Sequence, residues 1–489
     1  MKHILFLFTL ACTAGCCFAA ADAADTKKPN VVFFLIDDLG VNDIGANNPK
    51  TFYETPNVDQ LAREGVRFTN GYTACCVCSP TRYSIQSGKY PARGAHTIWF
   101  GSTDNGKVKA KFRDAEYVDQ MALSEITLGE AFHDAGYKTV FVGKWHLGPN
   151  EDFYPEKQGY DVNIAGGKHG NPGKDGYFSP YNELHNLPNG PEGEYLTHRL
   201  AREAAEQIKQ AKDKPFLLYF ATYQVHTPLQ APEALIKKYE EKAARLGLPT
   251  KGPEVFVNSE ENNPANGQPI RIRQIQSLPV YAAMVEEMDA AVGKVIQTLK
   301  DEGIYDNMVI VFVSDNGGQA GQPTSNLPLR AGKGWVYEGG HRVPYIIKAP
   351  GIKSGVSDTP VITTDFYPTL LELAGLPLKP QQHLDGVSLK PVLDGGSIAE
   401  RPLYWHYPHY TSFPAGALRD GDWKFIRRYE DGKTELYNLK SDPYETADLS
   451  GKETAKVREL AEKHNAWLKS VNARFLREKD GSGKPWQPE

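Results

Sequence analysis

The sequence predicts an α/β fold: a large, doubly wound and mostly parallel sheet flanked by helices, followed by a smaller C-terminal α+β domain. Short apolar runs alternate with helical patterns along most of the chain, which is typical of buried parallel strands. The chain has 489 residues, more than one hydrophobic core usually supports, and its pattern changes near residue 401. We therefore expect a main domain over residues 25–400 and a second domain over residues 401–489.

Residues 1–24 have the composition of a signal peptide. Lys2 and His3 precede an apolar run over residues 4–10, and small residues follow up to Ala21. This run is too short to stay in a membrane as a spanning helix, and no later stretch is long and apolar enough to span one. We expect export to a periplasm or to the cell exterior. A lipoprotein anchored at Cys16 is the less favoured alternative, because no Leu or Val stands three positions before it.

The main sheet is predicted from five short apolar runs, all expected to be parallel strands. They cover residues 31–36, 139–142, 216–221, 309–313 and 345–347. A first helix should begin after Thr127, which can form a capping box with Glu130, and should end at Gly136. Apolar residues at helical spacing predict two further helices over residues 281–299 and 365–374.

Two later segments have different patterns. Residues 241–274 are polar, rich in Pro, Gly and Asn, and without periodicity, which predicts a long surface loop suited to act as a lid. In the C-terminal domain, two strand-like runs over residues 423–428 and 434–439 flank a turn and predict a hairpin. A terminal helix is expected over residues 454–475.

Polar side chains gather where four of the predicted strands end. In chain order they are Asp37 and Asp38, Lys144 and His146, His226, and Asp315 and Asn316. The carboxyl ends of parallel strands lie along one edge of a sheet, where ligands bind. We therefore expect these residues to line one crevice.

The acidic and amide members of this group predict a metal site. Asp37, Asp38, Asp315 and Asn316 offer only oxygen ligands, and their three carboxylates would repel one another unless a cation lay among them. An oxygen-only set suits calcium or magnesium rather than zinc. One such pair alone is more simply a helix cap or an Asx-turn, but two pairs at equivalent strand ends favour a metal.

The run Cys78-Ser79-Pro80-Thr81-Arg82 predicts an anion site. Ser79 can cap a helix over residues 81–87, whose amide groups, together with the Arg82 fork, favour sulfate or phosphate oxygens. After the signal peptide, all cysteines lie within residues 75–78, so no disulfide framework links distant segments. A thiolate at position 78 would be nucleophilic, yet it is a poor neighbour for a hard cation. An unmodified Cys78 is therefore chemically incompatible with the predicted metal site beside it.

Cys78-x-Pro80-x-Arg82 resembles the signature of the formylglycine-dependent type I sulfatases, relatives of arylsulfatase A in the alkaline-phosphatase superfamily. The resemblance covers nearly the whole mature chain in blocks that keep the family's order. They include Asp37-Asp38-Leu39-Gly40, Gly143-Lys144-Trp145-His146, His226-Thr227-Pro228, Ser314-Asp315-Asn316-Gly317-Gly318, and Lys333 with Glu338-Gly339-Gly340-His341. Two departures, Thr81 for Ser and Ser87-Gly88 for Thr-Gly, each keep a hydroxyl.

The resemblance implies a modified residue and a metal. In this family a dedicated maturation enzyme oxidises the signature cysteine to an aldehyde, formylglycine, whose hydrate carries two hydroxyls. Cys78 is the residue that would be modified here. The resemblance further implies that modified Cys78 holds one calcium ion together with Asp37, Asp38, Asp315 and Asn316.

It also implies catalytic roles. One hydroxyl of the hydrate would attack the sulfur of a sulfate ester, while calcium, Arg82, Lys144 and Lys333 offset the sulfate charge. His226, together with Lys333, would assist the leaving alcohol. His146 would take the proton of the second hydroxyl, so that free sulfate leaves.

We expect the substrate to be a sulfated carbohydrate cleaved from a chain end, with a galactose or N-acetylgalactosamine ester as the specific hypothesis. The run Trp405 to Tyr410 combines aromatic and imidazole side chains, which can stack on sugars and bind their hydroxyls. The candidates for substrate binding are His383, His406, His409 and Arg419. A packed turn between the two domains explains the same run equally well.

Three alternatives remain open at this point: an arylsulfatase of broad specificity, a phosphatase or phosphodiesterase of the same superfamily, and a non-catalytic glycan-binding protein on this scaffold. Cys78 and the oxygen-only ligand set disfavour the second, and the complete set of polar positions disfavours the third. The formal net charge of -5 offers no basic surface for nucleic acid.

Overall fold

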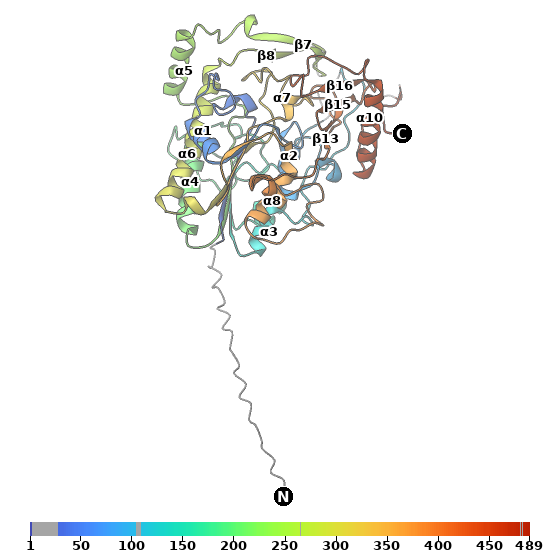
Figure 1. Ribbon diagram of the computed structural model, residues 1–489. Coiled ribbons are helices and arrows are strands. Elements are labelled where there is room, and N and C mark those ends of the chain that lie inside the picture. The colour runs from blue at the N-terminus through green and yellow to red at the C-terminus, as the bar shows by residue number, and fades with distance from the viewer. Residues whose placement is uncertain (2–27, 104–108, 265, 480, 482) are drawn as a thin grey trace.

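The computed structural model describes residues 1, 28–103, 109–264, 266–479, 481 and 483–489. The signal peptide predicted for residues 1–24 lies outside the described residues, apart from Met1. Figure 1 shows a large α/β body with a smaller, mainly β part on one side. Within the described ranges, no helix is both long and apolar enough to cross a bilayer.

The central sheet is built from eight strands. They are β1 (Asn30–Ile36), β2 (Val66–Phe68), β4 (Lys138–Gly143), β5 (Val162–Ile164), β6 (Phe216–Ala221), β9 (Met308–Ser314), β10 (Tyr345–Lys348) and β11 (Gly355–Ser357). Their order is β11-β2-β10-β9-β1-β6-β4-β5, and β9, β1, β6, β4 and β5 are mutually parallel. The sheet is therefore mostly parallel, as predicted.

Strand β10 corrects one expectation. Residues 345–347 were expected to add a parallel strand, but β10 pairs antiparallel with both β9 and β2. A short apolar run indicates that a strand is buried but carries no information about its direction.

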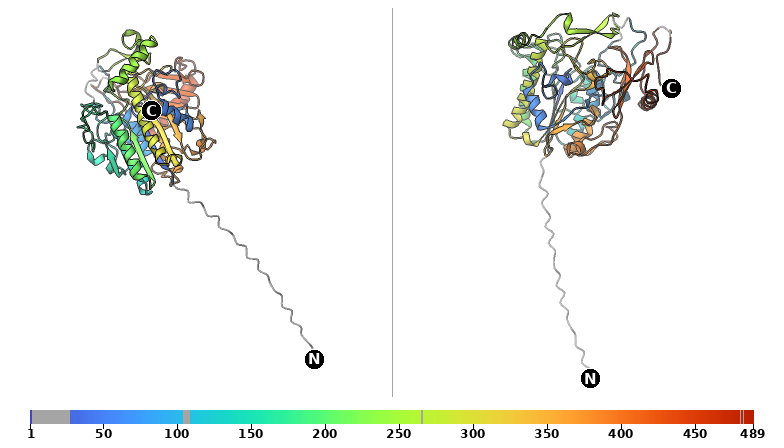
Figure 2. Two further views of the ribbon diagram at one scale, coloured as in Figure 1. Left: turned by 90° about the vertical axis from the view of Figure 1, so that its left-hand side faces the viewer. Right: turned by 45° about the horizontal axis from the view of Figure 1, so that its top comes forward.

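Helices cover both faces of the central sheet (Figure 1). One layer holds α1 (Pro56–Glu64), α4 (Leu196–Ala211) and α6 (Pro279–Asp301), and the other holds α2 (Cys78–Ser87), α3 (Leu128–Asp134) and α8 (Phe366–Leu373). Alternate residues of β1 serve the two layers: Val32 and Phe34 pack into the first, and Val31 and Phe33 into the second. Figure 2 shows α4 in green and α6 in yellow side by side. Burial on both faces explains why the strands are uninterrupted apolar runs.

Three of the helices predicted for the main domain are α3, α6 and α8. At the start of α3, Thr127 Oγ1 accepts a hydrogen bond from Glu130 N at 3.0 Å, and Glu130 Oε2 accepts one from Thr127 N at 2.7 Å. The predicted capping box is therefore present, and it satisfies two amide groups that the helix itself leaves unpaired.

The polar segment over residues 241–274 is more regular than expected. Helix α5 (Glu233–Arg245) enters it, and β7 (Phe256–Asn262) and β8 (Pro269–Arg273) then form an antiparallel hairpin. Most of β7 is exposed, so it lacks the apolar alternation that would have predicted a strand. Figure 2 shows the hairpin along the top of the molecule, and an ion pair of 2.6 Å between Glu261 and Arg428 ties it to the C-terminal domain.

The C-terminal domain is a four-stranded antiparallel sheet covered by a helix. Its elements are β13 (Leu403–Tyr407), β14 (Ala415–Asp420), β15 (Trp423–Arg428), β16 (Thr434–Asn438) and α10 (Thr454–Ser470). The predicted hairpin is β15–β16, and the terminal helix ends at Ser470, before the expected residue 475. Trp405 joins the two domains, because its indole Nε1 donates a 2.7 Å hydrogen bond to Thr73 O.

Four short elements complete the α-helices and β-strands of the described residues. Strands β3 (Gly71–Tyr72) and β12 (Val361–Ile362) form a small parallel pair, and α7 (Glu338–His341) and α9 (Lys390–Leu393) are single-turn helices.

Candidate active site

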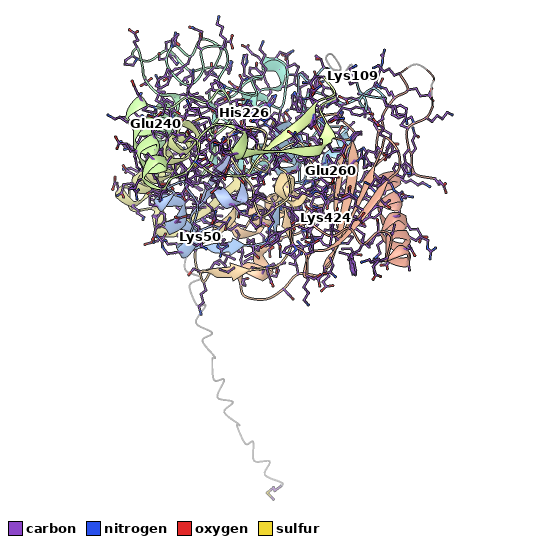
Figure 3. All side chains as sticks on the ribbon, turned by 90° about the horizontal axis from the view of Figure 1, so that it is seen from above. Lys50, Lys109, His226, Glu240, Glu260 and Lys424 are labelled. Atoms are coloured by element: carbon purple, nitrogen blue, oxygen red, sulfur yellow. The ribbon has the colours of Figure 1, made fainter. Side chains whose placement is uncertain are left out.

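The carboxyl edge of the central sheet collects the polar residues that the sequence singled out. Residue Ile36 of β1 is in register with Ser314 of β9, and Gly143 of β4 with Ala221 of β6, so the segments that follow these strands lie side by side. Figure 3 looks down on this edge and labels His226 there. The structure brings together Asp37, Asp38, Cys78, Arg82, Lys144, His146, His226, Asp315, Asn316 and Lys333.

Charges of opposite sign are paired throughout this site. Each of its three carboxylates has a cationic partner at short distance. The N···O distances are 2.6 Å for Lys144–Asp37, 2.6 Å for Lys333–Asp38 and 2.7 Å for Arg82–Asp315. The site therefore sets three cationic side chains against three carboxyl groups, an arrangement able to accept a cation and an anion together.

Two buried oxygens in the site have unmet bonding capacity. Asp37 Oδ1 and Asn316 Oδ1 have no hydrogen-bond partner among the residues that the structure describes. Burial, together with the neighbouring Asp315 carboxylate, raises the pKa of Asp37 to about 8. Burial opposes ionisation of Asp38 as well, but Lys333 and His226 outweigh it and lower the pKa of that carboxyl. Crowded oxygen ligands with open acceptor positions fit a hard cation.

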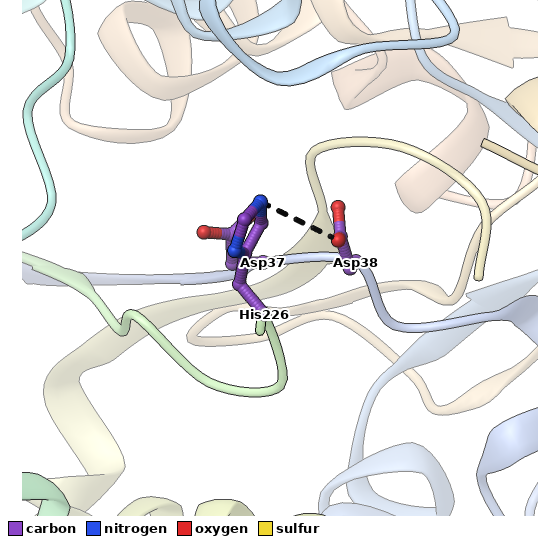
Figure 4. Close-up of side chains that lie close together, drawn as sticks. All are labelled: Asp37, Asp38 and His226. Atoms are coloured by element: carbon purple, nitrogen blue, oxygen red, sulfur yellow. Dashed lines mark ion pairs between the residues drawn. The ribbon is translucent and has the colours of Figure 1, made fainter. Parts of the chain in front are cut away.

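His226 lies at the edge of the same group. The ligand atoms of Asp37, Asp38 and His226 all lie within 4.8 Å of one another. Figure 4 draws these three side chains close together. The dashed line in Figure 4 is the 3.8 Å contact between His226 Nε2 and Asp38 Oδ2. His226 Nδ1 is 2.8 Å from Thr227 O, so the neutral ring donates from Nδ1 and leaves Nε2 directed at Asp38.

Cys78 is the first residue of α2, which corrects the expected helix start. The N-cap residue is Val77, and Ser79 Oγ instead accepts a 3.0 Å hydrogen bond from Phe100 N. The site therefore lies beside the free amide groups of a helix N-terminus, which favour an anion. Burial raises the pKa of the Cys78 thiol although Lys144 and Lys333 act to lower it. An unmodified Cys78 would thus be protonated and a weak nucleophile at neutral pH.

His146 is oriented toward Cys78. Its Nδ1 is 3.5 Å from Cys78 Sγ and its Nε2 is 3.1 Å from Phe100 O. The carbonyl can only accept, so Nε2 carries the proton and Nδ1 is left as a base facing position 78. Burial, with Lys144 and Arg82 nearby, lowers the pKa of His146 well below its ordinary value and keeps the ring neutral.

The side chains of His226 and Lys333 mark the open side of the site. Their exposed fractions are 18% and 13%, whereas Asp37 and Lys144 are completely buried. An ester entering the site would meet these two side chains first.

Three of the residues expected to bind substrate lie elsewhere. His383 packs against Gly88, at the opposite end of α2 from Cys78. His406 is held inside the C-terminal domain, with Nδ1 2.7 Å from Tyr429 Oη and Nε2 2.8 Å from Arg474 O. Arg419 donates to Tyr72 Oη and lines a hollow that contains none of the catalytic residues. Aromatic and imidazole side chains occur in domain packing as well as in sugar binding. In this structure, His383, His406 and Arg419 make packing contacts or hydrogen bonds within the protein.

His409, the fourth of these residues, is buried between the two domains. Its Nε2 is 2.8 Å from Thr97 Oγ1. Phe100 could not be identified from the sequence, although its carbonyl sets the tautomer of His146 and its amide holds Ser79. These contacts use backbone atoms of a loop, which no side-chain pattern reveals.

A doubly wound sheet that gathers carboxylates, cations and histidines around one buried position at a helix N-terminus defines a hydrolase of anionic esters. The sulfatase family profile matches residues 29–376, and the profile of the N-sulphoglucosamine sulphohydrolase C-terminal region matches residues 331–473. The chain therefore belongs to the sulfatase family and is a sulfuric ester hydrolase.

Individual relatives agree with this assignment. A sulfatase of Formosa agariphila is 31% identical over 528 aligned residues, which cover 91% of this chain and 90% of the relative. Human N-acetylgalactosamine-6-sulfatase is 31% identical over 407 residues, covering 78% of this chain and 68% of the human protein.

Solved structures show the same fold. The structure of Ps i-CgsB in complex with k-i-k-neocarrahexaose has a TM-score of 0.73 and 28% identity, covering 95% of each chain. The phosphonate monoester hydrolase of Agrobacterium radiobacter, at 20% identity and a TM-score of 0.62, covers 92% of this chain and 100% of its own. The fold thus extends to a phosphorus ester hydrolase, while the family profile assigns this chain to the sulfatases.

Proposed function

We propose that this sulfatase releases inorganic sulfate from a sulfated carbohydrate, using a formylglycine made from Cys78 and one calcium ion. The position of Cys78 carries the proposal: it begins α2, faces His146 Nδ1 at 3.5 Å, and is buried. A hydroxyl of the proposed hydrate would lie about where its Sγ lies. An oxygen nucleophile there is compatible with the carboxylates around it, whereas a buried, protonated thiol is not. The aldehyde would be made by a dedicated maturation enzyme.

Asp37, Asp38, Asp315 and Asn316 would hold the calcium ion with the modified residue 78. When bound, the ion would supply positive charge beside the nucleophile and the ester oxygens. The open acceptor positions on Asp37 Oδ1 and Asn316 Oδ1 support this assignment. The four residues offer only oxygen ligands, which favours calcium over zinc. His226 is not counted among the ligands, because we assign it to proton transfer.

The cationic side chains would bind the sulfate group. Arg82, Lys144 and Lys333 are each fixed by an ion pair, so their charges are in place before a substrate arrives. Preorganised charge of this kind stabilises a transition state without further reorganisation. Arg82 is also held by a 2.6 Å hydrogen bond from its Nη1 to Lys144 O, which fixes the direction of its fork.

Two histidines would move protons. His146 Nδ1 is the base that faces position 78, and it would take the proton from the modified residue as sulfate departs. His226, on the open side of the site beside Lys333, would assist the departing alcohol. Burial and Lys333 lower the pKa of His226 to about 4, so its ring is neutral at pH 7 and would have to gain a proton before it gave one to the alcohol.

A sulfated carbohydrate is the proposed substrate class. Human N-acetylgalactosamine-6-sulfatase and Ps i-CgsB with its neocarrahexaose are relatives at 31% and 28% identity, which supports a galactose or N-acetylgalactosamine ester. The deep position of Asp37, Lys144 and Cys78 favours a sulfated chain end over a position within a chain. Action on sulfated aryl alcohols is the alternative. The predicted signal peptide supports export, to a periplasm or out of the cell.

Mass spectrometry tests the modified residue. The tryptic peptide over residues 68–82 should carry an aldehyde in place of the Cys78 thiol in active protein. The Cys78→Ala variant should release no sulfate, whereas Cys75→Ala, at a buried neighbouring cysteine, should keep its activity. Full activity with an unmodified thiol at position 78 would refute the proposal.

Paired substrates test the reaction class and the substrate. Sulfate and phosphate monoesters of the same sugar alcohols, and an aryl sulfate, should be compared by release of inorganic anion. We expect preference for a sulfated galactose or N-acetylgalactosamine. Preference for the phosphate ester would refute the assignment as a sulfatase. Preference for the aryl sulfate would favour an arylsulfatase of broad specificity.

Metal analysis tests the ligand set. The purified protein should contain one calcium ion per chain, and Asp315→Asn should lose it. His226→Ala should retain it. Loss of the metal from His226→Ala, or zinc in the purified protein, would contradict the oxygen-only site.

A further inference from the structure

A hollow of about 510 Å³ lies outside the catalytic centre. Its walls come from the loop after β1, from β2, from the loop around Leu327, and from Tyr444 in the turn after β16. It is thus formed by the main domain and the C-terminal domain together. None of the residues placed in the catalytic centre lines it. Figure 3 labels Lys50, on its rim, well apart from His226.

The lining of this hollow is basic and lacks acids. It includes Lys50, Arg67 and Arg342 but no Asp or Glu, although the whole chain has a net charge of -5. Arg67 Nη1 donates a 3.0 Å hydrogen bond to Asn47 Oδ1. In the described part of the chain, neither Lys50 nor Arg67 has a carboxylate partner, and Arg342 has only Glu338 at 3.7 Å. Positive charge that the protein does not neutralise is available to an external anion.

Apolar and amide groups accompany these cations. Tyr444 is 43% exposed and Leu327 is 47% exposed, so the hollow offers large apolar side chains to solvent. Asn47 and Asn48 add amides on the same wall. An aromatic face, amides and cations together match the apolar faces, hydroxyls and sulfate groups of a sulfated sugar.

We propose that this hollow, which we call the Lys50–Arg67 hollow, is a second and non-catalytic binding site for a sulfated carbohydrate chain. Lys50 and Arg67 hold sulfate groups other than the one being cleaved, and Tyr444 stacks on a sugar ring. The proposal rests on the proposed function for its substrate class, because the two sites take sulfates of the same kind of chain. The hollow raises the affinity for chains over single sugars and takes no part in the reaction itself.

Binding measured without turnover tests the proposal. The Cys78→Ala protein is titrated with a carrageenan hexasaccharide bearing several sulfates, with the same hexasaccharide after desulfation, and with a DNA oligonucleotide of equal charge. We expect Lys50→Gln with Arg67→Gln to weaken binding of the sulfated hexasaccharide about tenfold, the equivalent of about 1.4 kcal/mol. Lys50→Arg with Arg67→Lys should keep the affinity, because the charges remain. Lys237→Gln with Lys294→Gln removes two exposed charges from α5 and α6 and should also keep it.

A second measurement separates this proposal from the proposed function. In protein with intact Cys78, the Lys50→Gln, Arg67→Gln variant should release sulfate from a sulfated monosaccharide at the unaltered rate. Unchanged hexasaccharide affinity in this variant would overturn the second site, as would equal binding of the desulfated chain or of DNA. If no sulfated sugar is hydrolysed but hexasaccharide affinity falls as expected, the second site stands and the proposed reaction fails.

Discussion

Individual side chains in the catalytic centre are held by fixed partners. Lys144 has no exposed surface, and its ammonium lies 2.6 Å from Asp37 Oδ2. Removing one member of a buried pair leaves the other charge unpaired, which costs more than the pair contributes. The stability of the protein should therefore depend on what neutralises Asp37.

Replacing Lys144 tests this dependence. We expect Lys144→Met to lower the free energy of unfolding by about 3 kcal/mol in a calcium chelator, because Asp37 stays buried without its partner. Calcium should restore part of that loss. Urea unfolding with chelator and with calcium measures both. Lys463→Met, which breaks an exposed pair with Asp420, is the control and should change little. If calcium did not change the free energy of unfolding of Lys144→Met, the proposed metal site would be contradicted.

His146 should matter for turnover and not for metal content. We expect His146→Ala to lower kcat by about 10²- to 10⁴-fold, since the base facing position 78 is lost. Conversion of Cys78 and the calcium content should be unchanged, as peptide mass and metal analysis would show. The control is His133→Ala on α3, whose side chain is 52% exposed. Turnover of His146→Ala near that of the parent would rule out the proposed proton transfer.

The loop that follows β9 is positioned by close backbone packing. Gly317 N donates a 3.0 Å hydrogen bond to Gly340 O, and a Cβ at Gly317 would lie 1.8 Å from Gly339 O. Only glycine allows this approach between the β9 loop and α7. The packing fixes Asn316, and with it one expected calcium ligand.

Enlarging Gly317 should therefore damage the proposed calcium site. We expect Gly317→Ala to lower both the calcium affinity and the free energy of unfolding by more than about 1 kcal/mol, because the β9 loop must move away from α7. Gly321→Ala is the matched control, since the nearest atom to its Cβ is 3.8 Å away. Calcium titration and urea unfolding of both variants decide the matter. Equal behaviour of the two would show that the close approach is unimportant.

Across the whole molecule, buried neutral histidines link stability to pH. Burial lowers the pKa of His341, His406 and His464 to about 3 each. The pKa of an unfolded histidine is about 6.5, so the unfolded chain binds these protons first. Their contribution to stability is thus complete above about pH 6.5 and is lost as pH falls toward about 3.

Removing one of these histidines should make the free energy of unfolding depend less steeply on pH. Between about pH 6.5 and about pH 4, we expect His406→Gln to reduce the slope of the unfolding free energy by up to about 1.4 kcal/mol per pH unit. The glutamine amide can still donate to Arg474 O. Urea unfolding at several pH values gives the slope, and His133→Gln should leave it as in the parent. An unaltered slope in His406→Gln would mean that His406 does not titrate on unfolding.

The sequence predicts the main strands and helices of this molecule because buried segments are recognisable by their apolar residues. The apolar runs of β1, β4, β6 and β9 and the capping box of α3 were found from residue types alone. Their polar ends indicated one edge of the sheet, where the structure places Asp38 and Asp315 together.

The remaining features depend on information that residue types do not carry. The direction of β10 is set by pairing with β9, most of β7 is exposed and polar, and Ser79 accepts a hydrogen bond from a distant amide instead of capping its own helix. His383 and His406 resemble binding residues in the sequence, but the structure places His383 against Gly88 and His406 beside Tyr429, away from the catalytic residues.

The pairing of Lys144 with Asp37 and of Lys333 with Asp38 has a consequence for the order of events. A single ammonium group cannot hold a carboxylate and an incoming ester at full strength, so the acids and the substrate compete for the same lysines. A cation that takes over the acids frees the lysines for the ester. By thermodynamic reciprocity, a bound ester raises the affinity for the cation by the same factor. If these acids hold a cation as proposed, the protein should keep that cation best where substrate is plentiful and lose it most readily where substrate is absent.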